Sequence, residues 1–290
     1  MDEFRIGTRK SALAMIQTRM VAERIFMAYP GMPVTVIPCI TRGDVNLKSP
    51  IADFGGKGAF VAEIEQLLVE GRIDLAVHSA KDLPEEIDPR TEIISILPRE
   101  DPSEVLLTVG NSSREILNIG TSSPRRQMLV KKMFPEASCR LLRGNVPTRI
   151  ERLRRGEYDG IVLALAGIKR LRMDHEADLD YRIFEPSEFI PAACQGIIAV
   201  QIRRDGIHSQ LVRRLTDENS QCQLMLEREI LRTLGAGCHD AVGVHTRING
   251  GSVDISVLLE RNSIQHSCSF SIEKFRLTDV PQIVSRMMEI

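Results

Sequence analysis

The feature of this sequence that most constrains its fold is a regular alternation of short apolar segments with amphipathic ones over the first hundred residues. Phe4–Thr8, Pro33–Thr41 and Glu92–Leu97 are short and rich in β-branched residues, which is typical of strands. Ile73–His78 is almost wholly apolar, as expected of a strand buried on both faces of a parallel sheet. Strands that alternate with helices predict an α/β fold with helices packed on a sheet. The helices are expected at Ala12–Ala28, with Ser11 as N-cap, and at Phe60–Val69.

A second series of the same kind follows Pro98–Pro102, a segment that we expect to be a hinge. Pro186–Pro191 is a second irregular crossing, and periodicity does not decide which sheet the strand Gly196–Ile202 joins. The elements expected between the two crossings are strands at Glu104–Val109, Asn118–Thr121, Cys139–Leu142 and Gly160–Ala166, and helices at Arg125–Phe134, Thr148–Arg155 and Ile168–Leu171.

The remainder of the chain changes style. A helix at Gln221–Leu234 precedes three segments that alternate like antiparallel strands, and a last helix is expected from Val280; the strands are Ala241–Ile248, Val253–Glu260 and His266–Ile272. The sequence therefore predicts two α/β domains and a small α+β C-terminal domain with a three-stranded antiparallel sheet. The domain bounds are expected at residues 1–98 with 196–215, at 102–190 and at 216–290.

Composition excludes several classes of protein. With 43% hydrophobic and 27% charged residues the chain is an ordinary globular one. It lacks the ~18 uninterrupted apolar residues of a membrane span, and its charged start, Met1–Arg5, lacks the layout of a signal peptide. We therefore expect a cytoplasmic protein with no membrane partner. Its 6 cysteines show no C-x-x-C pair, so no metal site is expected and the thiols are expected to be reduced.

The net charge of −1 conceals an asymmetry. Residues 114–172 contain 14 Lys or Arg against 5 Asp or Glu, and the whole chain has 30 Arg and only 8 Lys. The flat guanidinium group binds carboxylates or phosphates in a bidentate manner, whereas lysine offers a point charge. The segment is either a solvated charged surface or the binding site of a polyanion, which would be a nucleic acid or a small molecule rich in acid groups.

Five polar clusters are expected at strand-to-helix or strand-to-loop junctions, where open α/β sheets bind ligands. Lys81 and Asp82 emerge together from a buried strand, and they form either a structural ion pair or a catalytic carboxylate with a cationic neighbour. Cys238 follows flexible glycines and is therefore expected to be accessible, but a lone cysteine is by itself weak evidence for a functional site. The clusters are Thr8–Ser11, His78–Asp82, Gly120–Arg126, Arg143–Arg149 and Gly235–His239.

The cluster Gly120–Arg126 is typical of an anion site. Small hydroxylated residues at a helix start leave backbone N–H groups for an anion. Arg125 and Arg126 in the first turn oppose the helix dipole with no evident structural return, which favours a functional role. Arg143–Arg149 is again basic at a helix start and is otherwise interpreted as a solvated turn.

These motifs, in this order, resemble the porphobilinogen deaminase (hydroxymethylbilane synthase) family over about residues 4–245. They are Arg5-Ile-Gly-Thr-Arg9-Lys-Ser11, Thr41-Arg42-Gly43-Asp44, Gly55-Gly56-Lys57-Gly58, His78-Ser79-x-Lys81-Asp82, Gly120-Thr-Ser-Ser-x-Arg125-Arg126, Leu142-Arg143-Gly144-Asn145 and Gly237-Cys238. The resemblance implies two domains like those of type II periplasmic binding proteins and a third that carries the cysteine. It also implies a transferase of tetrapyrrole (haem) biosynthesis, which condenses four porphobilinogen molecules into hydroxymethylbilane and releases ammonia.

The resemblance also implies roles for single residues. Asp82 and Lys81 would be catalytic, Cys238 would carry a dipyrromethane cofactor through a thioether, and Lys57 would lie in a lid. The residues implied to bind the cofactor are Ser11, Lys81, Asp82, Thr121, Ser123, Arg125, Arg126, Arg143 and Gly144. Those implied to bind the substrate are Arg9, Ser11, Phe60, Arg143, Arg149, Arg170 and Gln195.

Two positions depart from the family pattern. After Cys238 the family has Gln-Val-Pro-Ile-Gly, whereas this chain has His239-Asp240-Ala241-Val242-Gly243. Asp53 stands in the lid where some members carry a basic residue. We expect these changes to alter the packing of the cofactor loop and the charge of the lid, and to leave the activity class unchanged.

Two other classes of function compete with this interpretation. A periplasmic-type binding protein would share the two-domain architecture, but it needs an export signal and has no use for Cys238. A nucleic-acid platform would explain the basic segment, but it needs stacking aromatics, and the chain has no Trp and only 3 Tyr. We therefore expect a monomer whose partner is a small molecule and not a nucleic acid. An excess of two pyrrole units in the intact mass would distinguish the deaminase from both.

Overall fold

The computed structural model describes residues 3–39, 61–110, 116–235, 240–250, 252–261 and 264–273. These residues form two compact units. Unit 1 is built from Met1–Glu100 and Gly196–Leu234, and unit 2 from Asp101–Gln195 and Gly235–Phe275. The division into three domains with the bounds given above stays a prediction. Among the described residues, no helix has both the length and the apolar character needed to cross a membrane.

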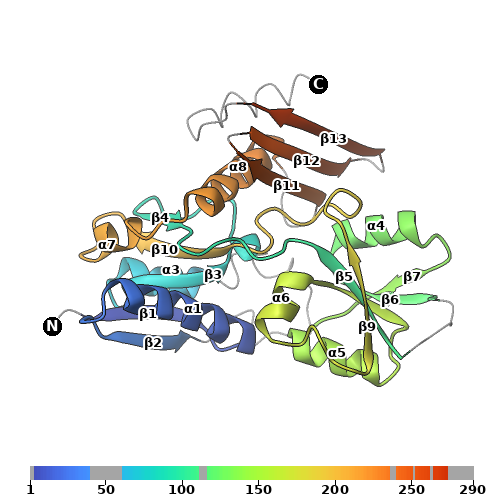
Figure 1. Ribbon diagram of the computed structural model, residues 1–290, viewed down its shortest axis with the longest axis horizontal. Coiled ribbons are helices and arrows are strands. Elements are labelled where there is room, and N and C mark those ends of the chain that lie inside the picture. Colours follow the sequence, from blue (N-terminus) through green and yellow to red (C-terminus); the bar gives the residue numbers. More distant parts are fainter. Residues whose placement is uncertain are drawn as a thin grey trace. The chain divides into compact units, whose positions relative to one another are not determined.

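Unit 1 contains a five-stranded sheet with the order β2-β1-β3-β10-β4 (Figure 1). Strands β1, β2 and β3 are parallel, and β10 is antiparallel to both of its neighbours. Strand β10 therefore returns to the first sheet, a point that the periodicity leaves open. The elements of the unit are β1 (Phe4–Arg9), α1 (Ala12–Ala28), β2 (Val34–Cys39), α3 (Ala62–Val69), β3 (Leu75–Ser79), η3 (Ala80–Asp82), β4 (Thr91–Ile94), β10 (Ile198–Arg203), α7 (Ser209–Arg213) and α8 (Glu218–Leu234).

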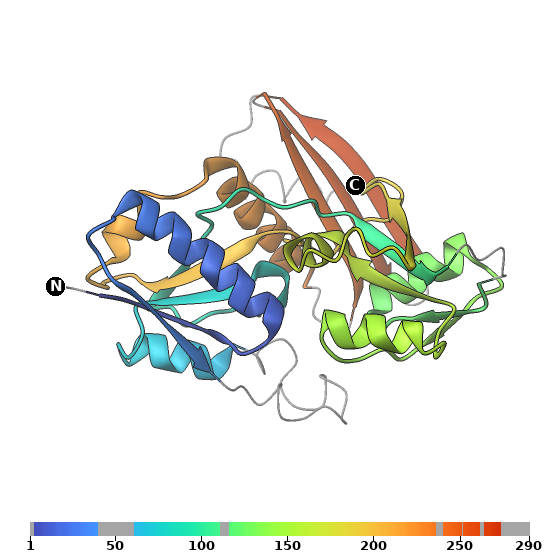
Figure 2. The same ribbon diagram turned by 60° about the horizontal axis from the view of Figure 1, so that its bottom comes forward.

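Helices α1 and α3 cover opposite faces of this sheet (Figure 2). Val21 and Ile25 of α1 pack on Phe4 and Ile6 of β1, which alternate along one face of the strand. Gly7 lies on the other face of β1. A Cβ atom there would come within 2.4 Å of the Ile73 side chain and 3.3 Å of Ile64 of α3, so this face is also tightly packed. Both faces of the central strands are thus covered, which confirms the interpretation of the apolar run before His78.

Unit 2 contains a second five-stranded sheet, with the order β7-β6-β8-β5-β9. Strand β6 is parallel to β7 and β8, whereas β5 is antiparallel to β8 and β9. In each sheet the antiparallel strand is the first one after a crossing: β5 follows the first crossing and β10 the second. The elements of the unit before Gln195 are β5 (Glu104–Val109), β6 (Asn118–Gly120), α4 (Pro124–Met133), β7 (Ser138–Arg140), α5 (Val146–Arg154), β8 (Gly160–Ala164), α6 (Leu165–Arg170) and β9 (Leu179–Phe184).

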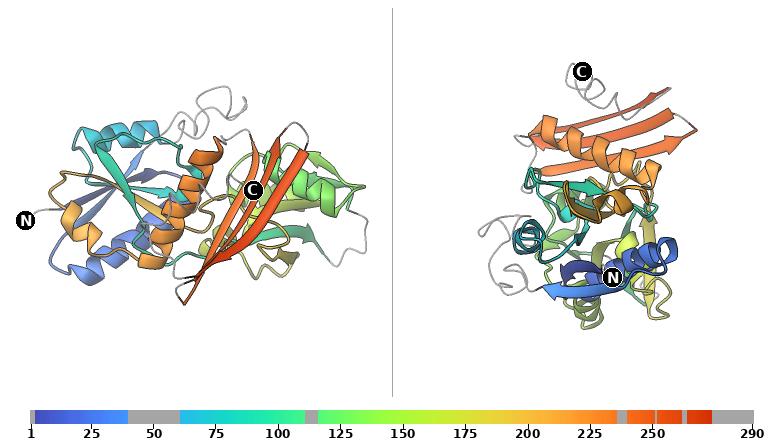
Figure 3. Two further views of the ribbon diagram at one scale, coloured as in Figure 1. Left: turned by 90° about the horizontal axis from the view of Figure 1, so that it is seen from above. Right: turned by 90° about the vertical axis from the view of Figure 1, so that its left-hand side faces the viewer.

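Three long antiparallel strands complete unit 2, in the order β11-β12-β13 (Figure 3). They are β11 (Ala241–Asn249), β12 (Ser252–Arg261) and β13 (Ile264–Ile272). Leu258 of β12 joins the core formed by Leu129 and Val130 of α4 with Phe189. The predicted α/β fold class is confirmed: each unit contains a five-stranded α/β sheet, and unit 2 also contains the predicted three-stranded antiparallel sheet.

Local sequence explains where the helices begin. The side chains of Ser11, Ser123 and Asn145 each accept a hydrogen bond from a backbone N–H in the first turn of α1, α4 and α5, respectively. Pro124 occupies the first turn of α4, where a missing N–H group has no cost. Strand β9 and the five-residue helix α7 are not among the predicted elements, and several strands begin or end one to three residues away from their predicted bounds. The helix expected from Val280 lies outside the described residues.

Candidate functional site

The first group of candidate residues lies at the carboxyl ends of β1 and β3, in unit 1. These two strands are parallel neighbours, so the residues that follow them meet at one edge of the sheet. Ser11 caps α1 through a bond from the Ala14 N–H at 3.4 Å. One turn further on, the Gln17 amide donates to the Ser79 hydroxyl at 2.9 Å, which joins α1 to the end of β3.

Lys81 and Asp82 follow β3 in a single turn of 3₁₀ helix, and both side chains are half-buried. The Ala80 N–H donates to the carbonyl oxygen of Ile197 at 3.0 Å, so the turn is fixed to the chain entering β10. The carboxylate of Asp82 is therefore held on a short, hydrogen-bonded turn, partly open to solvent.

His78 lies directly before this turn and is 6% exposed. Burial lowers the pKa of its imidazole to about 4, although Asp82 raises this pKa and Arg9 lowers it further. The charges of Arg9 and Asp82, two of the predicted site residues, both act on His78. The three side chains therefore share one electrostatic environment. At neutral pH His78 is uncharged.

Sequence reasoning missed the polar network beneath His78. The Gln201 amide donates to Glu65 Oε1 at 2.6 Å and to Thr91 Oγ1 at 2.8 Å, and the Gln201 side chain raises the pKa of the neighbouring His78. Gln201 is fully buried on the apolar strand β10. The sequence does contain a signal for this network, namely a single glutamine within an apolar strand. A buried amide requires polar partners.

The second group lies at the carboxyl ends of β6 and β7, in unit 2. The Thr121 N–H donates to the carbonyl oxygen of Arg140 at 2.9 Å, and the Ser122 hydroxyl donates to that of Leu142. The two strand ends are thus bound together, and Arg143 and Gly144 follow at once. Ser123 accepts from the Arg126 N–H at 3.4 Å and starts α4.

The segment after β7 is shaped by Gly144, whose φ is +109°, a value that favours glycine. Arg149 lies on the first turns of α5, half-buried, and its Nε donates to the Gly144 carbonyl oxygen at 2.7 Å. Arg143 and Arg170 are also half-buried. Gln195 is fully buried, and its amide donates to the carbonyl oxygen of Pro102 at 2.8 Å. Gln195 is therefore tied to the first crossing segment.

Arg125 and Arg126 are buried, with exposed fractions of 3% and 7%. The carboxylate of Glu104, which is fully buried, forms ion pairs with both: Oε1 pairs with Arg125, and Oε2 lies 2.8 Å from Nη2 of Arg126. Arg125 and Arg126 therefore do have a structural role, contrary to the expectation from the sequence, because they neutralise a buried acid on strand β5.

Several candidates lie outside the described residues, namely Lys57, Phe60, Asp53, Cys238 and His239. Among the residues that are described, no group of three or more His, Cys, Asp or Glu side chains could hold a metal ion. The donors that are described are arginines, hydroxyl groups and backbone N–H groups. In addition, Nε of Arg126 is buried without a hydrogen-bond acceptor. This donor set fits a ligand with several carboxylates.

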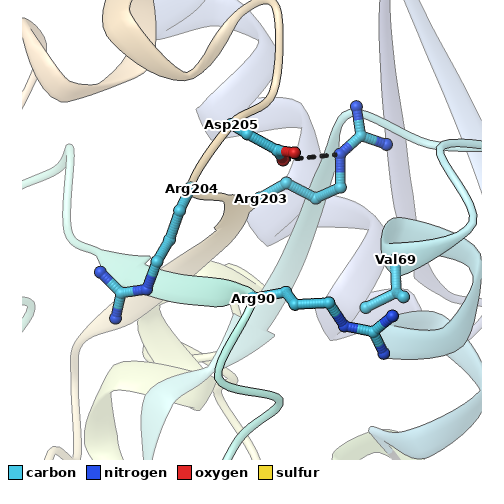
Figure 4. A pocket seen from close by; sticks show the side chains of 5 residues that line it. All are labelled: Val69, Arg90, Arg203, Arg204 and Asp205. Atoms are coloured by element: carbon cyan, nitrogen blue, oxygen red, sulfur yellow. Dashed lines mark ion pairs between the residues drawn. The ribbon is translucent and has the colours of Figure 1, made fainter.

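Unit 1 also has a cavity of about 440 Å³, which lies away from the two sheet edges that carry the candidate residues (Figure 4). Arg203, at the far end of β10 from Ile198, contributes to its lining, so it lies at the opposite edge of the sheet from Asp82. Arg203 faces Asp205 at 3.7 Å, and the other lining arginines have carboxylate partners too. The charges of this cavity are balanced by the chain itself, and we assign it no ligand.

Comparisons with known proteins agree with the motifs. The profile of the family described as "Porphobilinogen deaminase, dipyromethane cofactor binding domain" matches residues 4–210. A porphobilinogen deaminase of a Roseiflexus species is 41% identical over 250 residues, which are 84% of this chain and 82% of that protein. That of Rickettsia prowazekii is 38% identical over 268 residues, 89% and 88% of the two chains. A probable porphobilinogen deaminase of Methanopyrus kandleri is 38% identical over 255 residues, 86% and 85%.

Among solved structures, an arginine-specific periplasmic binding protein of Salmonella typhimurium has a TM-score of 0.41 and 10% identity, and covers 79% of this chain and 94% of its own. The family profile spans both sheet edges described above, from the end of β1 to the return strand β10, and several relatives match most of the chain. On this evidence the chain belongs to the porphobilinogen deaminase family, and it is an enzyme of tetrapyrrole biosynthesis.

Proposed function

We propose that this chain is a hydroxymethylbilane synthase, which joins four porphobilinogen molecules head to tail and releases ammonia. The observation that carries the proposal is the half-buried carboxylate of Asp82. It lies at the end of a buried strand, on a turn anchored to β10, in a chain of this family. This chemistry requires a fixed carboxylate, because ammonia leaves and a new ring is deprotonated in steps that generate positive charge.

Asp82 would stabilise that positive charge near the pyrrole nitrogens. A fixed carboxylate does so without reorganising during the reaction, which is the counterpart of an oxyanion hole. His78, whose pKa is lowered to about 4, stays neutral beside it and adds no competing positive charge at neutral pH. Lys81 and Arg9 bring cations to the same edge, where they would bind carboxylates of the substrate.

The arginines of unit 2 would bind the acetate and propionate groups of the pyrroles. Each porphobilinogen unit brings two carboxylates, so the product is a polyanion, and a planar guanidinium can bind a carboxylate through two parallel bonds. Arg143 and Arg149 are half-buried, so they keep solvent-accessible surface for this purpose. Thr121, Ser123 and Gly144 would add hydroxyl and backbone donors. Phe60, Arg170 and Gln195 would be further substrate contacts, and Lys57 would belong to the lid.

The family profile is that of a dipyrromethane cofactor-binding domain, and we propose Cys238 as the attachment point. The bound group would supply the pyrrole carbon to which the first substrate unit is joined. Burial raises the thiol pKa of Cys39 and Cys139, and that of Cys222 to about 11. A raised pKa makes a thiol a poorer nucleophile at neutral pH. Cys238 is proposed because Gly237-Cys238 matches the motif of the family. A cytoplasmic location and a monomeric state stay predictions.

Intact mass and substrate consumption together test the proposal. The purified protein should exceed its sequence mass by two pyrrole units, and it should consume porphobilinogen and release ammonia. Cys238→Ser should lose the mass excess and the turnover, whereas Cys222→Ser should keep both. Binding of porphobilinogen without consumption would instead indicate a binding protein. A full mass excess in Cys238→Ser would show that another residue carries the cofactor.

A further inference from the structure

One buried carboxylate holds Arg125 and Arg126, the two arginines in the first turn of helix α4. Glu104 is the first residue of β5, a strand flanked by β8 and β9, and its side chain is fully buried. Its two oxygens divide between the two guanidinium groups: Oε1 pairs with Arg125 Nη2, and Oε2 lies 2.8 Å from Arg126 Nη2. A single acid thus fixes two adjacent residues of helix α4.

Backbone acceptors complete the positioning. Nη1 of Arg125 donates to the carbonyl oxygen of Ile190 at 2.7 Å, and Nη1 of Arg126 donates to that of Val162 at 2.9 Å. Each guanidinium group is therefore contacted at both Nη atoms, once by Glu104 and once by a backbone carbonyl oxygen. These contacts restrict the orientation of both groups.

The charges of this triad are not balanced. Two guanidinium groups and one carboxylate leave one surplus positive charge among three side chains that are more than nine-tenths buried. A buried charge is costly unless it is paired. Nε of Arg126 is in addition a buried donor without an acceptor. An external carboxylate would balance the surplus charge of the triad and could give the unpaired Nε of Arg126 an acceptor.

We propose that Glu104 is a positioning residue of the ligand-binding site, which orients Arg125 and Arg126 and cancels one of their two charges, so that the pair accepts one carboxylate of a pyrrole carboxylic acid. This inference rests on the proposed function. Without Glu104, the two guanidinium groups repel each other and lose their orientation. The carboxylate ligand then meets a pair that is more highly charged and no longer ordered.

The chain offers a matched control. Glu227 of α8 is also fully buried, it pairs with Arg99 at 2.6 Å and 3.3 Å, and both residues belong to unit 1. Replacing either glutamate removes one acid from a buried ion pair. The two substitutions should therefore lower stability alike, and only the one at Glu104 should affect the ligand.

The experiment compares Glu104→Gln, Glu104→Asp and Glu227→Gln as full-length proteins. Three quantities are measured: the melting temperature, the fraction of protein that carries the two-pyrrole mass excess, and kcat and KM for porphobilinogen. We expect both Gln variants to melt about 5 °C or more below the parent. We expect only Glu104→Gln to lose most of the mass excess and to raise KM at least about tenfold. Glu104→Asp, which keeps the charge, should recover part of both.

Several outcomes would overturn the inference. It fails if Glu104→Gln melts lower but keeps the mass excess and KM of the parent, since Glu104 would then be structural only. It also fails if Glu227→Gln loses the mass excess to the same degree, because the loss would follow from instability. If the parent protein itself lacks the mass excess and leaves porphobilinogen unchanged, the proposed function fails instead.

Discussion

Gly196 lies against Glu100 so closely that a Cβ atom on Gly196 would come within 2.1 Å of the Glu100 carbonyl oxygen. The Glu100 N–H donates to the Gly196 carbonyl oxygen at 3.1 Å. Glu100 is where the chain leaves unit 1, and Gly196 is where it returns. The two crossing segments are thus hydrogen-bonded to each other at the place where both pass into unit 1.

Gly196→Ala tests this close approach. The φ of Gly196 is +89°, so alanine there is strained as well as in contact with the Glu100 backbone. Gly110 has a φ of +70° with nothing within 4 Å of its Cβ position, so Gly110→Ala carries the strain alone. We expect Gly110→Ala to lower the free energy of unfolding by about 1–2 kcal/mol and Gly196→Ala by about 3 kcal/mol or more. Equal losses in urea unfolding would contradict the close approach.

The ion pair between Arg99 and Glu227 should stabilise unit 1 strongly. Their side chains are 6% and 0% exposed, and removing one partner of a buried pair costs about 3–5 kcal/mol. The pair between Arg155 and Glu151 is exposed, and such pairs contribute about 0–1 kcal/mol. Glu227→Gln should therefore lower the free energy of unfolding by several kcal/mol in urea titration, and Glu151→Gln by less than about 1 kcal/mol. Similar values for the two variants would show that burial does not govern these pairs.

The sequence predicts elements well where local signals agree. Helix α1 has the predicted bounds, Ala12–Ala28, because the Ser11 cap and the Pro30-Gly31 break enclose it. Strand β5 likewise begins at Glu104 and ends at Val109 as expected. Strand β9 was missed because its residues alternate with charged ones, as on an edge strand that is half exposed. The pairing of β5 with β9 depends on long-range contacts that no local pattern contains.

In the candidate site too, features with a local sequence signal could be predicted, and contacts between distant residues could not. The clusters after β1, β3, β6 and β7 were found because strand ends and helix starts are local features. The pairing of Glu104 with Arg125 and Arg126 was not found, because the acid lies 21 residues from its nearer partner and sits on another element. The role of a buried arginine depends on which acid the fold brings to it. The two guanidinium groups were therefore interpreted from charge alone.

His78 should make stability depend on pH. Its folded-state pKa of about 4 lies below its ordinary value of 6.5 because burial disfavours the charged ring. The unfolded chain then binds the proton more readily, so this stabilisation is complete above pH 6.5 and is lost as the pH falls toward 4, by up to about 3 kcal/mol. His78→Gln should remove this part of the dependence in urea unfolding between pH 7 and 4. His175→Gln, at a side chain 91% exposed, should leave it in place. Parallel pH profiles for the parent and His78→Gln would show that the imidazole is not buried uncharged.

Arg149 should be sensitive to lysine despite the equal charge. Its Nε donates to the Gly144 carbonyl oxygen, and lysine can reproduce neither this bond nor the bidentate binding of a carboxylate that the guanidinium group allows. Arg152 lies on the same helix and pairs with Glu157 at 2.8 Å at the surface. We expect Arg149→Lys to lower kcat/KM for porphobilinogen at least about tenfold, a loss of one charge-assisted hydrogen bond, and Arg152→Lys to leave it unchanged. Unchanged kcat/KM in both variants would make Arg149 an ordinary loop-stabilising residue.

Asp82→Asn should reduce turnover at least about 10²-fold. Asparagine keeps the shape of the side chain and loses the charge that would stabilise cationic species, so the substitution isolates the electrostatic contribution. The melting temperature should change little, because Asp82 is half-buried on a surface turn whose anchoring bond is made by the Ala80 backbone. Asp82→Glu should retain part of the turnover, since the charge persists at a shifted position. Glu86→Gln, at an exposed position four residues further on, should retain all of it.

Intact mass must first confirm that each variant carries the same mass excess as the parent, so that a loss of turnover reports on chemistry. An Asp82→Asn variant with that mass excess and with the turnover of the parent would move the catalytic role to another carboxylate.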